Sequence, residues 1–201
     1  RGVFAWVTCP AVLSRLQRDL RLAKLPADSI SSPEVANGKA ACVPDSPLRL
    51  DTNKDKMVLE EFDFGCTAGD DVKQLAEWLA QASPEGNERV KQHLAVLHDD
   101  DFTHFVRHAT EVTARVGLNY ETKTVKKGAL FYEEFLPAET IFYSLVLAED
   151  SRSNKRDDMK AANVLGYLRE KMPSVLQIGA GETIGKGLCA VRLWKGEEAW
   201  S

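Results

Sequence analysis

A glycine-rich stretch near the carboxyl end, "LQIGAGETIGKGL", limits the folds open to this chain, because four of its thirteen residues are glycine. It leads into a strand-type apolar run, whereas nucleotide-binding glycine loops lead into a helix whose N-terminus faces the phosphates. A Walker loop also fails, because Ala180 and Gly187 stand where its first glycine and its hydroxyl residue belong. Ile184 replaces the third glycine of a dinucleotide fingerprint. The pattern therefore disfavours both nucleotide-binding folds.

The glycines predict that the backbone here comes close to another molecule or to a neighbouring chain. Gly179, Gly181, Gly185 and Gly187 permit positive φ angles and leave N–H groups unobstructed by a Cβ, and Lys186 adds a positive charge among them. This combination suits contact with a phosphate backbone or with a neighbouring chain. The alternative is a tight turn that joins two packed elements.

Helix-type and strand-type patterns alternate irregularly along the sequence. A helix that begins near Pro10 places Leu13, Leu16 and Leu20 on one face. Further helices are expected from Asp70, after Pro84, and at residues 99–109 and 157–171. Strands are expected at residues 3–7, 57–65, 94–98, 110–118, 128–137, 140–150, 174–179 and 187–194, with 140–150 as a central, two-sided strand. This mixture, which includes antiparallel hairpins, predicts an α+β fold.

The chain is expected to form a single domain of residues 1–201 with one inserted loop. Residues 23–56 contain four prolines among Ser, Asn, Asp and Gly, which predicts an extended loop insertion. The sequence opens on "RGVFAWVTCPAVL", which already reads as a buried strand followed by a helix. We therefore expect a fragment that lacks its natural N-terminal segment.

Charge and cysteine content exclude some classes of protein. The net charge of −4 argues against a protein that coats nucleic acid by bulk charge, although a local basic stripe is compatible with it. No apolar run approaches the length of a membrane span, so no membrane partner is expected. The four cysteines are scattered and form no C-x-x-C, which favours free thiols in a reducing compartment. No targeting segment is visible, and a cytoplasmic location is expected.

One local cluster could carry metal chemistry. His98, His104 and His108 lie close in sequence to the acidic run 99–101, and His104 and His108 share a helix face. Such sets occur in metal-dependent hydrolases, which is the alternative function for this chain. However, no glutamate follows His104 as in H-E-x-x-H. The acidic run reads better as helix-capping residues, with Asp99 as the expected N-cap.

Four sequence blocks carry a resemblance to a known family. They are "RGVFAWVTCPAVLSRL", "VLHDDDFTHFVRHATEV", "TARVGLNYETKTVKKGALFYEEFLPAETIFYSLVL" and the glycine-rich stretch. In this order they resemble the RAMP superfamily of CRISPR proteins, and within it the repeating backbone subunit of the type III-B Cmr effector complex. The resemblance leaves out residues 23–56 and 65–92. It implies a ferredoxin-like (RRM-like) core with a projecting β-hairpin and helical and loop insertions.

The resemblance also implies function and partners. Proteins of this kind bind CRISPR RNA in antiviral defence, stack into a filament along it with other effector-complex subunits, and meet target RNA. A thumb-like β-hairpin wedges into the guide–target duplex, and residues 117–130 match it. Three lysines within five residues fit phosphate contact there, although a merely solvated hairpin is the alternative. The expected RNA-binding residues are Arg115, Lys123, Lys126, Lys127, Gly179, Gly181, Gly185, Lys186 and Gly187.

The resemblance implies catalysis that this sequence does not carry. Relatives cleave target RNA with Mg²⁺ through an aspartate in a loop near their N-terminus. That loop would precede Arg1, so we expect no catalytic residue, no bound cofactor and no metal site here. Tyr132, Glu133 and Glu134 are candidates for assisting groups near the scissile phosphate, or else strand residues that make local pairs. Beside the RNA-binding subunit and the metal-dependent hydrolase, a third hypothesis for the chain is a structural module that binds only protein.

Overall fold

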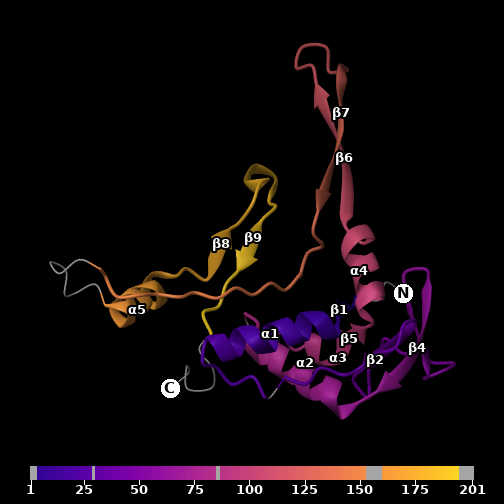
Figure 1. The fold of residues 1–201 in the computed structure, drawn as a ribbon. Coiled ribbons are helices and arrows are strands. Elements are labelled where there is room, and N and C mark those ends of the chain that lie inside the picture. The colour runs from indigo at the N-terminus through magenta and orange to yellow at the C-terminus, as the bar shows by residue number, and fades with distance from the viewer. Residues whose placement is uncertain (1–3, 29, 85–86, 153–159, 195–201) are drawn as a thin grey trace.

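The computed structural model describes residues 4–28, 30–84, 87–152 and 160–194. Figure 1 shows a body of helices and strands from which a long hairpin projects, with a second, smaller two-stranded ribbon and a helix beside it. The body contains β1 (Trp6–Thr8), α1 (Pro10–Leu22), β2 (Lys39–Cys42), β3 (Lys56–Leu59), β4 (Phe62–Ala68), α2 (Asp70–Ala82), α3 (Val90–His93), β5 (Leu94–Leu97) and α4 (Asp99–His108). The projecting parts are β6 (Glu111–Leu118), β7 (Val125–Phe135), α5 (Ala161–Lys171), β8 (Val175–Gln177), the short 3₁₀ helix η1 (Glu182–Ile184) and β9 (Leu188–Ala190). This architecture confirms the predicted α+β class.

The body is built on a five-stranded sheet in the order β1-β5-β2-β4-β3. β1 pairs with β5 and β2 with β4 in parallel, whereas β2 with β5 and β3 with β4 are antiparallel. Alternate residues of β5 point to opposite faces, as the strand period requires. Leu94 and Val96 join the cluster that α1 and α2 cover, and Ala95 and Leu97 join the cluster that contains Phe105 of α4. The sheet therefore has a core on each face.

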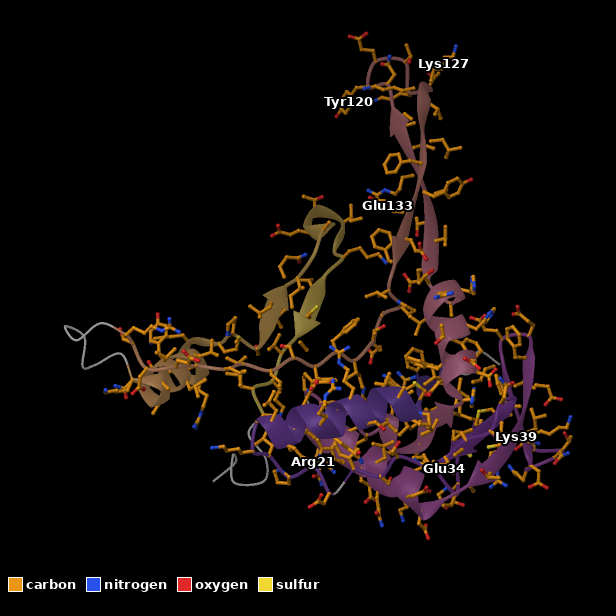
Figure 2. All side chains as sticks on the ribbon, in the orientation of Figure 1. Arg21, Glu34, Lys39, Tyr120, Lys127 and Glu133 are labelled. Atoms are coloured by element: carbon orange, nitrogen blue, oxygen red, sulfur yellow. The ribbon has the colours of Figure 1, made fainter. Side chains whose placement is uncertain are left out.

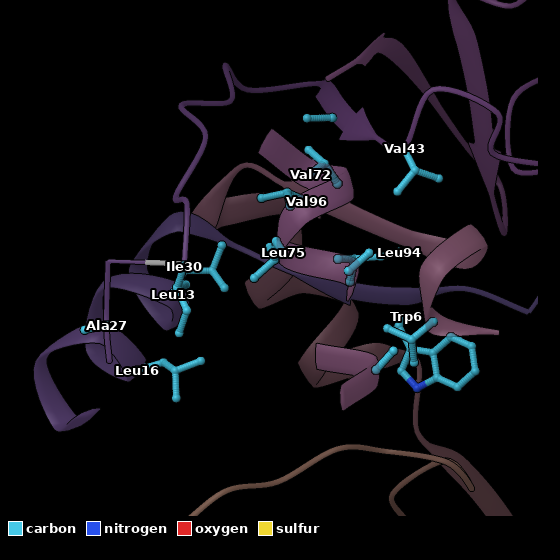
Figure 3. Close-up of a cluster of buried hydrophobic side chains, with 14 of the residues drawn as sticks. Trp6, Leu13, Leu16, Ala27, Ile30, Val43, Val72, Leu75, Leu94 and Val96 are labelled. Atoms are coloured by element: carbon cyan, nitrogen blue, oxygen red, sulfur yellow. The ribbon is translucent and has the colours of Figure 1, made fainter. Parts of the chain in front are cut away.

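Two helices form as their sequences predict. α1 begins at Pro10, whose fixed φ suits the first helical position, and it buries Leu13, Leu16 and Leu20. α2 begins with Asp70 and Asp71, whose charges suit the positive end of the helix dipole. Figure 3 shows leucines of α1 meeting those of α2 and β5 in the larger cluster.

The segment 23–56 is not only a loop. β2 lies within it, and its Ala40, Ala41 and Cys42 are buried at the centre of the sheet. Ala27 and Ile30 are buried against α1 as well. The strand is four residues long and carries two alanines, so no strand-type pattern marks it.

The predicted strand at 57–65 is a hairpin of β3 and β4. Glu60 lies between them with φ 51°, a left-handed conformation that reverses the chain. No glycine or asparagine occupies that position, which is why the turn escaped prediction.

The predicted central strand at 140–150 is wrong. In the structure these residues form no regular element, and Phe142 and Leu147 are largely exposed. The chain is held to the body near this segment by Tyr143, whose hydroxyl donates to Asp19 Oδ2 at 2.9 Å, and by Trp6, whose Nε1 donates to the carbonyl of Glu139 at 3.0 Å. An apolar run becomes a strand only where a partner strand accepts its backbone hydrogen bonds, and among the described residues none does so here.

The helix expected at 157–171 begins at Ala161 in the structure, and residues 157–159 lie outside the described part of the chain. None of its side chains is buried, and the apolar Val164 and Leu165 are 37% and 38% exposed. The chain then returns to the body, where the Trp194 ring lies 5.1 Å from that of Trp78 and Arg192 Nη1 donates to the carbonyl of Ser83 at 2.9 Å. Within the described residues, no helix has the length and apolar character needed to cross a membrane.

Candidate functional site

The hairpin of β6 and β7 is a free-standing arm. Its strands pair antiparallel from Glu111 opposite Phe135 to Leu118 opposite Val125, with a register shift between Val116 and Leu118. Both faces meet solvent, and Figure 2 shows side chains leaving it on either side. Residues 117–130, predicted as the thumb, are the distal part of this arm. A two-stranded ribbon of this kind has little core of its own, so its exposed side chains are available to a partner.

The tip of the arm concentrates positive charge. Asn119 shapes the turn, because its side-chain oxygen accepts hydrogen bonds from the amides of Glu121 and Thr122. Lys123 adopts φ 55° and its Nζ lies 4.1 Å from the centre of the Tyr120 ring. Within the described residues, no carboxylate oxygen lies within 4.0 Å of the Nζ atoms of Lys123, Lys126 and Lys127. All three predicted lysines therefore lie at the distal end of the arm without an ion-pair partner among the described residues, although Lys126 and Lys127, as successive residues of β7, face opposite sides.

The three candidate assisting residues are not brought to one point. Successive residues of a strand face opposite sides, so Tyr132 and Glu134 lie on one face of β7 and Glu133 on the other. Glu133 Oε2 lies 3.2 Å from Arg115 Nε, and Glu134 accepts a hydrogen bond from the hydroxyl of Thr110. The positive charge of Arg115 is therefore partly neutralised by Glu133. Tyr132 remains exposed.

The glycine-rich stretch is a compact turn between β8 and β9. All four of its glycines have positive φ, and a Cβ at Gly187 would lie 2.4 Å from the carbonyl oxygen of Ile178. The amides of Ile184 and Lys186 donate to the carbonyl of Gly181 at 3.0 and 3.1 Å, and that of Gly185 to the carbonyl of Glu182 at 3.0 Å. These amides therefore donate hydrogen bonds within the turn. The tight-turn alternative for the glycines therefore describes the structure, and the N–H of Gly185, one of the glycine amides expected to face a ligand, is already occupied.

The glycine-rich turn and the arm meet through Lys186. Its Nζ lies 3.0 Å from Glu111 Oε2 and 4.5 Å from the centre of the Phe135 ring, and those two residues face each other at the base of the arm. The two elements are thus joined on one side of the molecule (Figure 1). Neither Glu111 nor Phe135 was predicted as a site residue, because 75 positions separate Glu111 from Lys186 and no local pattern links them.

This contact predicts a pH effect. The hydrogen bond and the charge of Lys186 hold the pKa of Glu111 below its usual range. Because the folded pKa is lower than the unfolded one, the contact stabilises the fold above the unfolded pKa, and this stabilisation is lost as pH falls through the folded pKa. An NMR titration of the Glu111 side chain should give a midpoint below the ordinary 4.5, and Lys186→Ala should return it toward that value. An identical midpoint in both proteins would show that the two elements do not touch in solution.

The His/Asp cluster is used structurally. The N-cap of α4 is His98, not Asp99 as predicted, and its Nδ1 accepts from the amide of Asp100 at 3.3 Å. Asp99 instead accepts from the amide of Ala11 at 2.9 Å, which ties α4 to the start of α1. The His104 ring packs on Phe62, with ring centres 4.9 Å apart. In the part of the chain that the structure describes, no three His, Cys, Asp or Glu side chains are placed to share a metal ion.

Comparison with known families and curated proteins gives consistent matches. The family model of the RAMP superfamily matches residues 18–190. The CRISPR system Cmr endoribonuclease Cmr4 of Pyrococcus furiosus is 37% identical over 198 residues, which are 96% of this chain and 63% of that protein. The CRISPR system CMR subunit Cmr4 of Saccharolobus solfataricus is 32% identical over 108 residues, 54% of this chain and 32% of that one. The chain thus spans less than two thirds of the length of these relatives.

Solved structures agree with the sequence matches. Oligomeric Cmr4 from Pyrococcus furiosus superposes with a TM-score of 0.68 and 30% identity, covering 94% of this chain and 64% of that one. A subunit of the type III-B Cmr-beta complex bound to cognate target RNA has a TM-score of 0.63 at 21% identity, covering 94% of this chain and 60% of its own, and shows likeness of fold alone. These neighbours agree with the predicted ferredoxin-like core.

Proposed function

This chain belongs to the RAMP superfamily, and we propose that it is the repeating, CRISPR RNA-binding backbone subunit of a type III-B effector complex in antiviral defence. The Cmr4 relative at 37% identity supports this assignment. One observation of the structure carries the proposal. The tip of the arm bears three lysines without ion-pair partners among the described residues, and Lys186 joins the base of the arm to the glycine-rich turn.

The arm can hold RNA without reading its sequence. Lysines at the tip would neutralise phosphates, a contact that releases counterions and is the same for every base. Phe131 and Tyr132 are exposed on opposite faces of β7, where an unstacked base can lie on an aromatic ring. A subunit that must accept any guide needs this kind of binding. Residues 117–130 are therefore proposed as a thumb that enters the duplex between guide and target.

The glycine-rich turn is proposed to position the arm. Lys186 shares its charge with Glu111, so a phosphate would have to compete for it. Arg115 is likewise paired with Glu133. We therefore assign direct phosphate contact to Lys123, Lys126 and Lys127, which have no ion-pair partner among the described residues. Gly179, Gly181, Gly185 and Gly187 keep the turn compact enough for Lys186 to reach the base of the arm.

Target cleavage with Mg²⁺ is proposed for the whole protein and is not assigned to residues of this chain. The two candidate carboxylates on the arm do not fit a metal site, because Glu133 and Glu134 face opposite sides of β7 and each already has a partner. No step of cleavage is therefore derived from them.

Self-association and further effector-complex subunits are the proposed protein partners, and the cytoplasm is the proposed location. A relative of known structure is described as oligomeric Cmr4. Here the segment after the arm exposes Phe142, Leu147 and their neighbours beside α1, which gives a filament neighbour an apolar surface to bury.

A gel-shift titration tests the proposal. Two single-stranded RNAs of unrelated sequence, one of them derived from a CRISPR repeat, should be retained with dissociation constants that agree within about threefold, since phosphate contacts carry no sequence information. Three phosphate contacts predict a slope near −2 for log K against log salt on a single strand. Strong preference for one unrelated sequence, or no retention at about 100 µM protein in low salt, would contradict the proposal. Stoichiometric metal that is lost in His104→Ala would instead support the hydrolase.

A further inference from the structure

Two buried cysteines meet inside the sheet of the body. Cys42 of β2 lies opposite Ala68 of β4, and Cys66 of β4 lies opposite Ala40 of β2, so the two cysteines are diagonal neighbours on one face. Their Sγ atoms are 3.0 Å apart. Both belong to the smaller core cluster, and both thiols are free. A bond between them needs a sulfur–sulfur distance of about 2.05 Å, so the two sulfurs must close by about 1 Å.

The two cysteines differ slightly in exposure, since Cys66 is 4% exposed and Cys42 has no exposed surface. Cys66 lines an open pocket of about 420 Å³ together with Gly65 and Thr67, whereas Cys42 does not reach it. The side chain of Lys39 crosses this pocket, since a Cβ added to Gly65 would lie 2.6 Å from its Nζ. Figure 2 shows Lys39 and Glu34 at this edge of the body. Of the two cysteines, Cys66 is therefore the nearer to a small neutral molecule in the pocket, although its side chain points into the smaller core cluster.

The surroundings of the two thiols shift their pKa values in opposite directions. The hydrogen bond with the Cys42 thiol lowers the pKa of Cys66. Burial opposes this shift, and the charges of Arg49 and Asp55 act in opposite directions. That same bond, with burial, raises the pKa of Cys42. Arg49 is held in place by Pro44, whose carbonyl accepts from Nη1 at 3.0 Å. By contrast, burial raises the pKa of Cys9 to about 11. Thiolate character, which controls thiol reactivity, is thus favoured on Cys66 over Cys42.

We propose that Cys66 and Cys42 form a reversible redox-modification site for small peroxides. The Cys66 thiolate attacks one oxygen of hydrogen peroxide, the O–O bond breaks, and water leaves after protonation, so that the sulfur becomes a sulfenic acid. The Cys42 sulfur then attacks the Cys66 sulfur, the S–O bond breaks, and the hydroxyl leaves with the Cys42 proton as a second water. One peroxide is reduced and two thiols are oxidised to one disulfide. An external dithiol reverses the step by exchange.

The product would link β2 directly to β4 at the centre of the sheet. The two strands are already paired there, so the link fixes an existing arrangement and does not require a new one. The site lies in the body and not on the arm, and its test does not depend on RNA binding.

Mass spectrometry of the full chain decides the proposal. After brief exposure to hydrogen peroxide, free thiols are alkylated in denaturant and the digest is searched for linked peptides. We expect a Cys42–Cys66 link that dithiothreitol removes, with Cys9 and Cys189 still alkylated. Oxidation at Cys9 or Cys189 before Cys66, or four alkylated thiols after exposure, would overturn the assignment.

Two variants separate the roles of the cysteines. Cys42→Ala should let sulfenic acid persist on Cys66, where dimedone traps it, whereas Cys66→Ala should yield no dimedone adduct. Cys189→Ser changes a half-buried thiol outside the pair and should form the link at the wild-type rate. Equal dimedone labelling of both alanine variants would contradict the division of roles. If either alanine variant fails to fold, the linked peptide in the wild-type protein still decides.

Discussion

Replacing Lys123, Lys126 and Lys127 together with glutamate is expected to weaken RNA binding by at least about 100-fold. Each lysine contributes on the order of 1 kcal/mol through a charged contact to phosphate, and reversal adds repulsion to that loss. Because these three Nζ atoms have no carboxylate within 4.0 Å among the described residues, no internal ion pair is broken by the change. Gel shifts at several salt concentrations measure the effect.

The salt dependence distinguishes lost contacts from a misfolded arm. Loss of three phosphate contacts should bring the slope of log K against log salt about 2 units closer to zero. The weakening should be equal for unrelated RNA sequences, since phosphates carry no base code. A control for bulk charge is the triple reversal of Lys54, Lys73 and Lys171, exposed lysines outside the arm, which changes net charge by the same amount and, among the described residues, breaks only the surface ion pairs with Asp51 and Glu170. Equal weakening by both triple variants would show that bulk charge, and not the tip of the arm, binds RNA.

The parts of the structure that were predictable from sequence are those with a local cause. Leu13, Leu16 and Leu20 recur at helical spacing and lie on the buried face of α1. The lysine-bearing hairpin was equally visible, because its strands are adjacent in sequence and its turn carries polar residues. The positive φ angles expected of the four glycines are present, but the tight turn that they form was only the alternative interpretation of this stretch.

The remaining parts depend on partners distant in sequence. β2 is a strand because β4 and β5 flank it, although its own residues have weak strand preference. Residues 140–150 have the composition of a strand but no partner strand among the described residues, so composition alone predicted a strand that does not form. The contacts of Lys186 with Glu111 and of Cys42 with Cys66 follow from tertiary structure, and neither leaves a signal in a local pattern.

The division of the molecule into a packed body and an exposed arm predicts a large stability effect with no matching effect on binding. Leu75 of α2 has no exposed surface and lies in the larger core cluster (Figure 3). Leu75→Ala should lower the free energy of unfolding by about 2–5 kcal/mol, because it removes buried methyl groups and leaves a cavity. For a chain of this size, a loss of about 3 kcal/mol lowers Tm by about 6–12 °C. Thermal unfolding followed by circular dichroism measures this shift.

The matched change on the arm is Leu130→Ala, since Leu130 is 56% exposed. Its effect on unfolding should stay within about 0.5 kcal/mol, as for most surface positions. At a temperature where Leu75→Ala is still folded, its affinity for RNA should equal that of the wild-type protein, because the lysines at the tip of the arm are untouched. Weaker RNA binding by folded Leu75→Ala would mean that the geometry of the arm depends on packing in the body. The contact between Lys186 and Glu111 would then be too weak to position the arm, and the role proposed for the glycine-rich turn would be wrong.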